Sequence, residues 1–483
     1  MPLHIYIRRL LFFLAIIGFL VIAPLIVLYA TGFRWDFEQK RITQMGMITV
    51  KCIPRTVNIF INDKLKARRT YARIRDLMPR DYVVKLQKEG YSIWEKKLTV
   101  EPRVATPIKH ARLFLSEPEM TQIINSGIDQ YILSPNTKKI VYTINRGEEA
   151  DIWLLDVASH NSSKLFPKSK EEFAKVLEGL VFSDIKWSPD SEKVLVQYKT
   201  KSKKGTKPHQ LTYHVIINTS RPQDIIFLED LFKLEMEKVK WHPKDSNEIF
   251  WLNQGNFYSI KLDRKTLSPV LATQVLDFAI VNQDVYYVTE TLKDTEDTKK
   301  SKPTFQLVKK GLATLEEEII ADISDLGTEE FCEILAGKKR VALRLGEDQA
   351  LYILDKENKL QKIADKTQKA IWDSLQYKLL YQNDYEIFIL RFVDEDFDIE
   401  LEEPQQELIT RYSEKIQDCL WYPDFQHIIF SVKNTIKIIE LDGRDKRNVY
   451  EMGKVNVDDP KVSCGSKVKV VYFLNFFNFS TVK

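Results

Sequence analysis

The longest apolar run in the chain covers residues 10–30, where no residue carries a charge and nearly every side chain is large and apolar. At about 1.5 Å of rise per residue, a helix of this length reaches roughly the 30 Å of a bilayer's hydrocarbon core. A secretory signal has a shorter apolar region and a small-residue cleavage site, and residues 29–34 offer no convincing site of that kind. The pattern therefore predicts a transmembrane helix over 10–30 rather than a cleaved signal.

The residues around this span bear on its orientation. Arg8 and Arg9 precede it, and three cations between residues 34 and 41 follow it, so the positive-inside rule does not decide by itself. The short N-terminal tail decides the orientation, because about nine residues are easily retained in the cytoplasm as the start of a signal anchor. We expect residues 1–9 to be cytoplasmic, residues 31–45 to be a linker, and the rest of the chain to be extracytoplasmic.

From residue 46 to about residue 116 the pattern changes to short runs in which apolar and polar residues alternate. Val57, Ile59 and Ile61 fall on one face of one run, and Val84 and Leu86 fall on one face of another. Period-2 alternation is typical of half-buried strands, and prolines and Asn-Asp pairs separate the runs. The stretch 46–116 is therefore predicted to be a small antiparallel β-sandwich.

Motif residues recur through this stretch in a set order, which is Gly46, Ile48, Val50, Pro54, Val57, Ile59, Ile61, Asn62, Leu77, Pro79, Tyr82, Val84 and Leu86, then Lys88, Gly90, Tyr91 and Trp94 in a K-x-G-Y-x-x-W ending. This order resembles that of the PEGA domain family. The chain departs from the family at 54–57, where a proline-x-glycine-alanine turn is usual, and at Asp81, where a glycine normally precedes the tyrosine. The resemblance implies an extracytoplasmic, immunoglobulin-like binding or spacer module without catalytic residues.

After Glu117 a unit of about 45 residues recurs, and repetition at that period indicates a propeller or another array. Residues 131–142 align with 185–196 as strand, turn and strand, and residues 239–243 and 419–424 repeat the first half of this pattern. Proline followed by Asp or Asn favours a tight type I turn, and a third and a fourth strand follow in each unit. Four strands per unit are typical of a propeller blade.

Seven whole units and one partial unit at the C-terminus can be counted. An open sheet edge is unfavourable, so we expect a strand from about 120–125 to complete the partial unit. The sequence thus predicts a mainly β chain whose residues 117–483 form an eight-bladed β-propeller, with seven blades as the alternative. The motif W-S-P-D-[S/G]-x-K-[I/V], followed by an I-W-L-L-D strand, resembles the TolB-like and prolyl-oligopeptidase-type propellers over 118–483.

Composition narrows the classes of function. The 483 residues are 44% hydrophobic and 29% charged, with a net charge of +4, as in an ordinary globular chain. An excess of four positive charges is too small to indicate nucleic acid, which needs clustered basic residues. We expect no nucleic-acid partner.

Candidate chemistry is sparse. No G-x-S-x-G nucleophile elbow occurs, so the hydrolase domain that accompanies some related propellers is not expected, and we predict that the chain is not an enzyme. His242 and His427 lack a second ligand at metal spacing and are interpreted as turn residues, so neither metal nor cofactor is expected. The cysteines lack a C-x-x-C pair and are interpreted as buried thiols, with Cys332 and Cys419 in innermost strands: Cys52, Cys332, Cys419 and Cys464.

Insertions between strands carry the remaining information, because binding residues often lie on connections. Residues 168–180 are predicted to form an amphipathic helix, and 199–210 is a basic loop on the same face of the propeller. Residues 290–304 form a loop of mixed charge on that face too, and 394–407 an acidic loop on the opposite face; solvated loops without a binding role are the alternative. The helix would present Phe173, Val176, Leu177 and Leu180.

Two classes of function fit these features. The first is a single-pass bacterial cell-envelope protein that uses a PEGA-like module and a propeller to bind or scaffold a protein or an anionic wall polymer. The second is a sensor or accessory subunit that regulates a partner enzyme or transporter. The sequence does not separate the two, and it does not specify an oligomeric state.

The basic loop generates a testable prediction. Five lysines lie within nine positions, and such a cluster attracts acidic partners through a field that salt screens over about 8–10 Å. Changing four of them, from Lys201 onward, to Glu should abolish a salt-sensitive interaction in pull-downs from solubilised membranes and leave the thermal midpoint nearly unchanged. An unaltered set of partners would show that the loop is a solvated surface without a binding role. The five are Lys199, Lys201, Lys203, Lys204 and Lys207.

Overall fold

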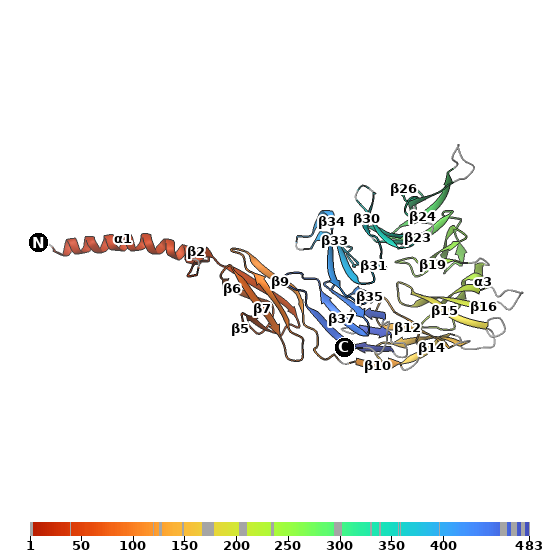
Figure 1. The fold of residues 1–483 in the computed structure, drawn as a ribbon, viewed down its shortest axis with the longest axis horizontal. Coiled ribbons are helices and arrows are strands. Elements are labelled where there is room, and N and C mark those ends of the chain that lie inside the picture. The colour runs from red at the N-terminus through yellow and green to blue at the C-terminus, as the bar shows by residue number, and fades with distance from the viewer. Residues whose placement is uncertain are drawn as a thin grey trace. The chain divides into compact units, whose positions relative to one another are not determined.

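A computed structural model describes residues 3–482 except 39, 119, 125–127, 147–148, 167–177, 202–209, 233–235, 294–301, 329–330, 338–339, 356, 358, 396, 455–460, 465–470 and 475–478. The chain divides into two compact units. The first comprises residues 1–118 and 439–452, and the second comprises 119–438 and 453–483. Figure 1 shows the elements of both units along the chain.

The first element is the helix α1 (Leu3–Ala30), which includes most of the stretch expected to be a tail before the span. An 18-residue window of its segment Ile7–Ala30 has a mean hydropathy of 3.1, and the segment is long and apolar enough to cross a membrane. The helix ends at Ala30, and Gly32 in the turn that follows has a φ of +87°, a conformation that glycine adopts at little cost. Sequence and structure thus agree on one long apolar N-terminal helix.

The expected linker 31–45 is not irregular. It holds a two-stranded antiparallel hairpin of β1 (Phe33–Asp36) and β2 (Arg41–Gln44), in which Trp35 lies opposite Ile42. The linker prediction missed this hairpin because two four-residue strands are too short to give a clear period.

The next seven strands form two sheets around one apolar core. The three-stranded sheet has the order β6 (Ala72–Leu77), β3 (Gly46–Ile53) and β9 (Ala105–Arg112). The four-stranded sheet has the order β5 (Lys64–Ala67), β4 (Asn58–Ile61), β7 (Asp81–Gln87) and β8 (Trp94–Thr99).

The alternation in these strands matches their burial. Ile59 and Ile61 of β4 and Val84 and Leu86 of β7 are buried in this core, as the period-2 pattern predicts. The prediction of a purely antiparallel sandwich is wrong in one place, because β3 pairs with β9 in parallel. Alternation is the same in both kinds of pairing, so the local pattern does not reveal strand direction.

One charged side chain is fully buried in the first unit. The ammonium of Lys96 in β8 donates to the carbonyls of Asp442, Arg444 and Lys446 at 2.6, 2.9 and 2.6 Å, and it lies 2.9 Å from the Glu440 carboxylate. Trp94 donates through Nε1 to the same carboxylate at 2.7 Å. A buried charge is tolerated only when it is paired and hydrogen-bonded, and Lys96 meets both conditions.

The rest of the chain forms four-stranded sheets, eight in all among the described residues. Three sheets are β11 (Gln130–Leu133), β12 (Lys139–Arg146), β13 (Glu149–Asp156) and β14 (Ser162–Phe166); β15 (Glu178–Trp187), β16 (Lys193–Lys201), β17 (Gln210–Asn218) and β18 (Ile225–Phe227), followed by the helix α3 (Leu228–Phe232); and β19 (Lys238–Trp241), β20 (Glu248–Asn253), β21 (Asn256–Lys261) and β22 (Thr266–Leu267).

Four further sheets follow in chain order. They are β23 (Val275–Val281), β24 (Asp284–Lys293), β25 (Lys302–Gly311) and β26 (Glu317–Asp322); β27 (Cys332–Ala336), β28 (Val341–Leu345), β29 (Ala350–Leu354) and β30 (Leu360–Ala364); β31 (Lys369–Trp372), β32 (Lys378–Gln382), β33 (Glu386–Asp394) and β34 (Ile399–Arg411); and β35 (Ile416–Trp421), β36 (His427–Val432), β37 (Thr435–Glu440) and β38 (Val449–Lys454).

The eighth sheet joins the two ends of this region. Its order is β10 (Met120–Ile124), β41 (Phe479–Val482), β40 (Val471–Leu474) and β39 (Lys461–Cys464), and β10 pairs with β41 antiparallel. In Figure 1 the label β10 stands beside the C-terminus. This region of the chain is a β-propeller. A strand from the start of the domain completes its last sheet, as predicted, and eight sheets agree with the favoured number of blades.

A tryptophan at the end of several first strands ties its sheet to the one before it. Trp187, Trp241, Trp372 and Trp421 each donate through Nε1 to a main-chain carbonyl of the preceding sheet's first strand. The acceptors are Ile132, Lys186, Leu335 and Ile371, at 3.1, 3.2, 2.9 and 3.0 Å. The repeated motif thus encodes both a turn and a bond between blades.

All four predicted insertions are partly strand in the structure. Residues 199–201 and 210 of the basic loop belong to β16 and β17, and residues 290–293 and 302–304 of the mixed-charge loop belong to β24 and β25. Glu178–Leu180, expected in a helix, begin the strand β15, while Phe173, Val176 and Leu177 lie outside the described residues. Most of the expected acidic loop, residues 399–407, belongs to the 13-residue strand β34. A polar-rich sequence does not exclude a strand, because pairing with a neighbouring strand can override local preference. Residue 178 pairs with β16, and residues 399–407 lie in the strand that pairs with β33.

The tryptophan bonds give a stability prediction. In Trp187→Phe or Trp421→Phe the acceptor carbonyl loses its donor, so the free energy of unfolding should fall by about 1–3 kcal/mol beyond the loss of ring area. Trp153→Phe is the matched control, because Nε1 of Trp153 has no hydrogen-bond partner in the described structure. Urea unfolding of the detergent-solubilised chain measures the difference. Equal losses in all three variants would show that the hydrogen bond contributes nothing.

Candidate functional site

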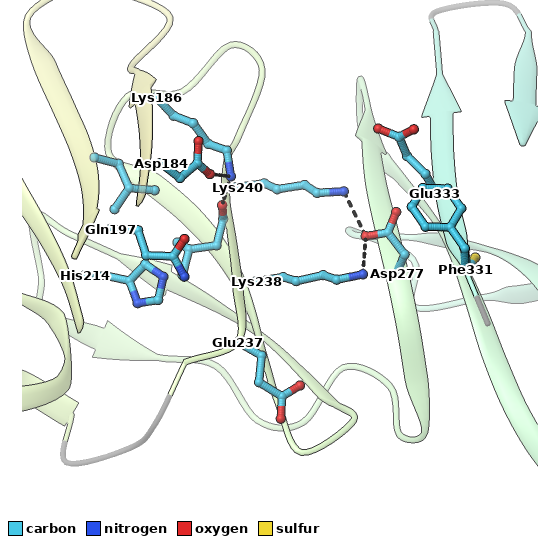
Figure 2. Close-up of a pocket in the computed structure, with 13 residues that line it drawn as sticks. Asp184, Lys186, Gln197, His214, Glu237, Lys238, Lys240, Asp277, Phe331 and Glu333 are labelled. Carbon is cyan, nitrogen blue, oxygen red and sulfur yellow. Dashed lines mark hydrogen bonds and ion pairs between the residues drawn. The ribbon is translucent and has the colours of Figure 1, made fainter. Parts of the chain in front are cut away.

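A pocket of about 330 Å³ lies among the first strands of four consecutive sheets, β15, β19, β23 and β27. Ten of its lining residues are labelled in Figure 2, and most of these are charged. Three lysines and four acidic residues contribute to its lining: Lys186, Lys238 and Lys240, and Asp184, Glu237, Asp277 and Glu333.

The local sequence explains why charges line this pocket. In β19 the side chains of Val239 and Trp241 are buried, and alternation turns Lys238 and Lys240 to the other face of the strand. The same alternation in β15 places Asp184 and Lys186 on the pocket. The strands β15 and β19 therefore present one apolar face to the packed blades and one charged face to the cavity.

Asp277 is the centre of the charge network. Its side chain is only 4% exposed, and its Oδ1 lies 3.3 Å from Nζ of Lys238 and 3.1 Å from Nζ of Lys240. The backbone N–H of Ile334 donates to Oδ2 at 3.0 Å. Figure 2 shows the two lysines running side by side from β19 toward this carboxylate. Two ammonium groups and one backbone N–H thus satisfy both oxygens of this buried carboxylate.

The two lysines retain donor capacity. Lys238 also donates to the Leu276 carbonyl at 2.9 Å, and Lys240 donates to that of Phe278. An ammonium has three N–H donors, and these contacts use two on each lysine. One donor on each remains for a ligand in the pocket.

Most of the remaining charges of the pocket are paired with a nearby opposite charge, and Glu237 instead accepts from the backbone N–H of Gln254 at 3.1 Å. Lys186 lies 2.7 Å from the Asp184 carboxylate and donates to the Val239 carbonyl at 3.1 Å. The Glu333 carboxylate lies 2.8 Å from Nε of Arg344. The pocket is therefore nearly neutral overall but strongly polar locally, which suits recognition of polar or charged groups more than apolar ones.

Two side chains with reactive groups contribute to the lining. His214 is buried, and its Nδ1 lies 2.7 Å from the Glu229 carboxylate, which also accepts from the backbone N–H of His214. Burial raises the pKa of the Cys332 thiol to about 12, so it stays protonated at neutral pH and is a poor nucleophile. Neither residue is arranged as an activated nucleophile.

The described residues hold no group of three or more His, Cys, Asp or Glu that could bind a metal ion. The imidazole of His242 instead accepts from the backbone N–H groups of Lys244 and Asp245 at 3.2 and 2.9 Å, so it holds a turn, as expected for the residue in place of the motif serine. His427 is the first residue of β36 rather than a turn residue, and its Nδ1 lies 3.0 Å from Asp424.

The predicted partner-binding lysines do not line this pocket among the described residues. Lys199 is half-buried in β16, and Lys201 is the last residue of that strand. Lys203, Lys204 and Lys207 lie outside the described residues. Their role in binding remains a prediction. Cys332 and Cys419 do lie in first strands, as predicted, but only Cys419 is buried, and Cys332 is half-buried.

No protein-family profile and no curated protein sequence matches this chain. Solved structures resemble it in fold. The C-terminal WD40 domain of Sif2 is 10% identical, with a TM-score of 0.48, over 76% of this chain and 98% of that one. The Dos1 propeller is 11% identical, with a TM-score of 0.45, over 76% and 94%. An oligogalacturonate lyase from Vibrio parahaemolyticus is 10% identical, with a TM-score of 0.40, over 76% and 98%.

Sequence reasoning overlooked the pocket because it concentrated on insertions. A signal was nevertheless present, since Lys precedes Trp in both Ile185-Lys186-Trp187 and Val239-Lys240-Trp241. Charged residues at alternate positions of a strand expected to be innermost indicate a polar central surface. The sequence gives no comparable signal for Asp277, because the first strand of its sheet lacks the Trp motif.

The high thiol pKa leads to a prediction about reactivity and pH. At pH 8 Cys332 in the folded chain should react with iodoacetamide about a thousandfold more slowly than a free cysteine of pKa about 8.5. The folded pKa lies above the unfolded value near 9, so the unfolded chain loses its proton first. The free energy of unfolding should therefore fall as pH rises from about 9 to about 12. Mass spectrometry of the labelled peptide measures the rate, and rapid labelling of the folded chain at pH 8 would contradict the burial of this thiol.

Proposed function

We propose that this protein is a single-pass, membrane-anchored, extracytoplasmic binding or scaffold protein of the cell envelope. The observation that carries the proposal is the polar pocket on four first strands of the propeller. Blades provide a rigid frame, and a concave site with a few convergent polar groups is the usual form of a binding site. The propeller fold alone would not indicate a function, because the same fold serves many.

The helix α1 supports the anchor. Its segment Ile7–Ala30 is apolar enough to span a bilayer, and none of it is buried by the rest of the described chain. A long apolar helix left uncovered in water would be costly, and a bilayer removes that cost. The N-terminus would be cytoplasmic, and the sandwich, resembling a PEGA module, would act as a spacer.

A non-catalytic role fits the chemistry of the pocket. Its thiol has a raised pKa, its histidine is paired with Glu229, and its lysines are engaged with Asp277. These groups bind and orient, and none is poised for nucleophilic attack. The partner we propose is a protein that places an acidic side chain on the free donors of Lys238 and Lys240, because a volume of about 330 Å³ admits only a small group.

Partner capture tests the role of the pocket. In a Lys238→Gln/Lys240→Gln double variant the amides still donate to Asp277 but no longer attract an acidic group, so captured partners should decrease at least tenfold in cross-linked membranes. Lys359→Gln/Lys362→Gln is the matched control, because both of its lysines are exposed and paired with neighbouring acids. Equal amounts of partner captured by the two double variants would show that the pocket does not bind the partner.

Protease accessibility tests the orientation. Protease added to intact cells stripped of outer layers should degrade the propeller, because the signal-anchor arrangement places residues 46–483 outside the membrane. If those residues stay protected until the membrane is opened, the orientation is wrong and the bulk of the chain is cytoplasmic.

A further inference from the structure

The hairpin of β1 and β2 has one exposed apolar face. Trp35 and Ile42 are direct cross-strand partners, so their side chains lie on the same face of the hairpin. They are 49% and 55% exposed, and Phe37 in the following turn is 84% exposed. A single two-stranded hairpin is marginally stable in water, and one with such a face needs a partner.

The hairpin is fixed to the end of α1 through both of its strands. From β1, Arg34 donates through Nη1 to the Tyr29 carbonyl at 2.8 Å, and its guanidinium stacks 3.6 Å from the centre of the Tyr29 ring. From β2, Gln44 donates through Nε2 to the Thr31 carbonyl at 2.7 Å. The Met45 N–H donates to the Gly32 carbonyl at 2.9 Å. These bonds satisfy carbonyls at the helix terminus and hold the hairpin directly beside it.

Ion pairs also hold the hairpin from the side of the sandwich, within the same compact unit. Arg34 lies 3.6 Å from Asp76, and Arg80 donates to Glu38 at 2.8 Å. The hairpin therefore cannot turn freely about the helix end, and its apolar face has a set direction.

We propose that this apolar face lies in the headgroup layer of the same bilayer that α1 spans. The proposal rests on the membrane anchor of the proposed function. Aromatic side chains are enriched at the membrane–water boundary because a ring can contact acyl chains while its polar edge stays hydrated. Trp35 provides such a ring five residues after the last helical residue, and Phe37 adds a fully apolar ring two residues further on.

The charges beside the face fit the same surface. Lys40 and Arg41 are exposed at the turn and at the start of β2, where they can meet lipid phosphates. Tyr29, at the end of the helix, is exposed as well. Rings, cations and helix end together form a collar, which we define as Tyr29, Trp35, Phe37, Lys40, Arg41 and Ile42. The collar would fix the depth of α1 and the distance of β3 from the membrane.

Fluorescence quenching by brominated lipids tests the proposal with the full chain in lipid nanodiscs. Trp35 is one of eight tryptophans, so lipids brominated near the headgroup should quench up to about one eighth of the emission. In Trp35→Phe that quenching should disappear. Trp153→Phe, with its substitution in the propeller, is the control and should be quenched like the parent chain.

The outcomes separate this proposal from the anchor. Equal quenching of the parent and Trp35→Phe, with α1 protected from protease by the nanodisc, would overturn the collar and leave the anchor intact. If slow hydrogen exchange over 33–44 accompanied that result, the face would belong to a protein partner. A chain that does not associate with nanodiscs at all would overturn both the anchor and the collar.

Discussion

The propeller depends on the contact between the first strands of neighbouring sheets. A four-stranded sheet has two faces to bury, and a blade can bury them only against the blades on either side. In four places a tryptophan indole makes this contact directional by donating to the carbonyl of the preceding first strand. A large ring fills the space between sheets, and its single donor sets the register of one sheet on the next.

The same contact accounts for the pocket. Once Trp241 and Val239 face the packed blades, the residues between and beside them must face the cavity. Lys238 and Lys240 therefore form ion pairs with Asp277 of the next sheet. These ion pairs join two blades and also make the lining of the pocket polar. Packing between blades and the proposed partner recognition thus use opposite faces of one strand, and a change on either face is expected to affect the other.

The first unit connects an apolar helix to a folded β-sandwich. Helix, hairpin and sandwich are joined by hydrogen bonds and ion pairs that converge on Arg34. Lys96 secures residues 439–452 in the same unit through three carbonyls and Glu440. With α1 as the proposed membrane anchor, these contacts would hold the hairpin and the sandwich next to the end of the helix.

The sequence by itself determined the apolar helix, the alternating strands of the sandwich and the four-stranded repeat, because each is encoded in a local period of hydrophobicity. It also predicted the closing strand near 120–125, since an open sheet edge would be unfavourable. Only the tertiary structure decided the parallel pairing of β3 with β9, the hairpin at 33–44 and the extension of β34 through 399–407. Pairing partners far apart in the chain set these features, and a local period carries no record of the partner. The pocket is of the same kind, because Asp277 meets Lys238 and Lys240 only when neighbouring sheets pack.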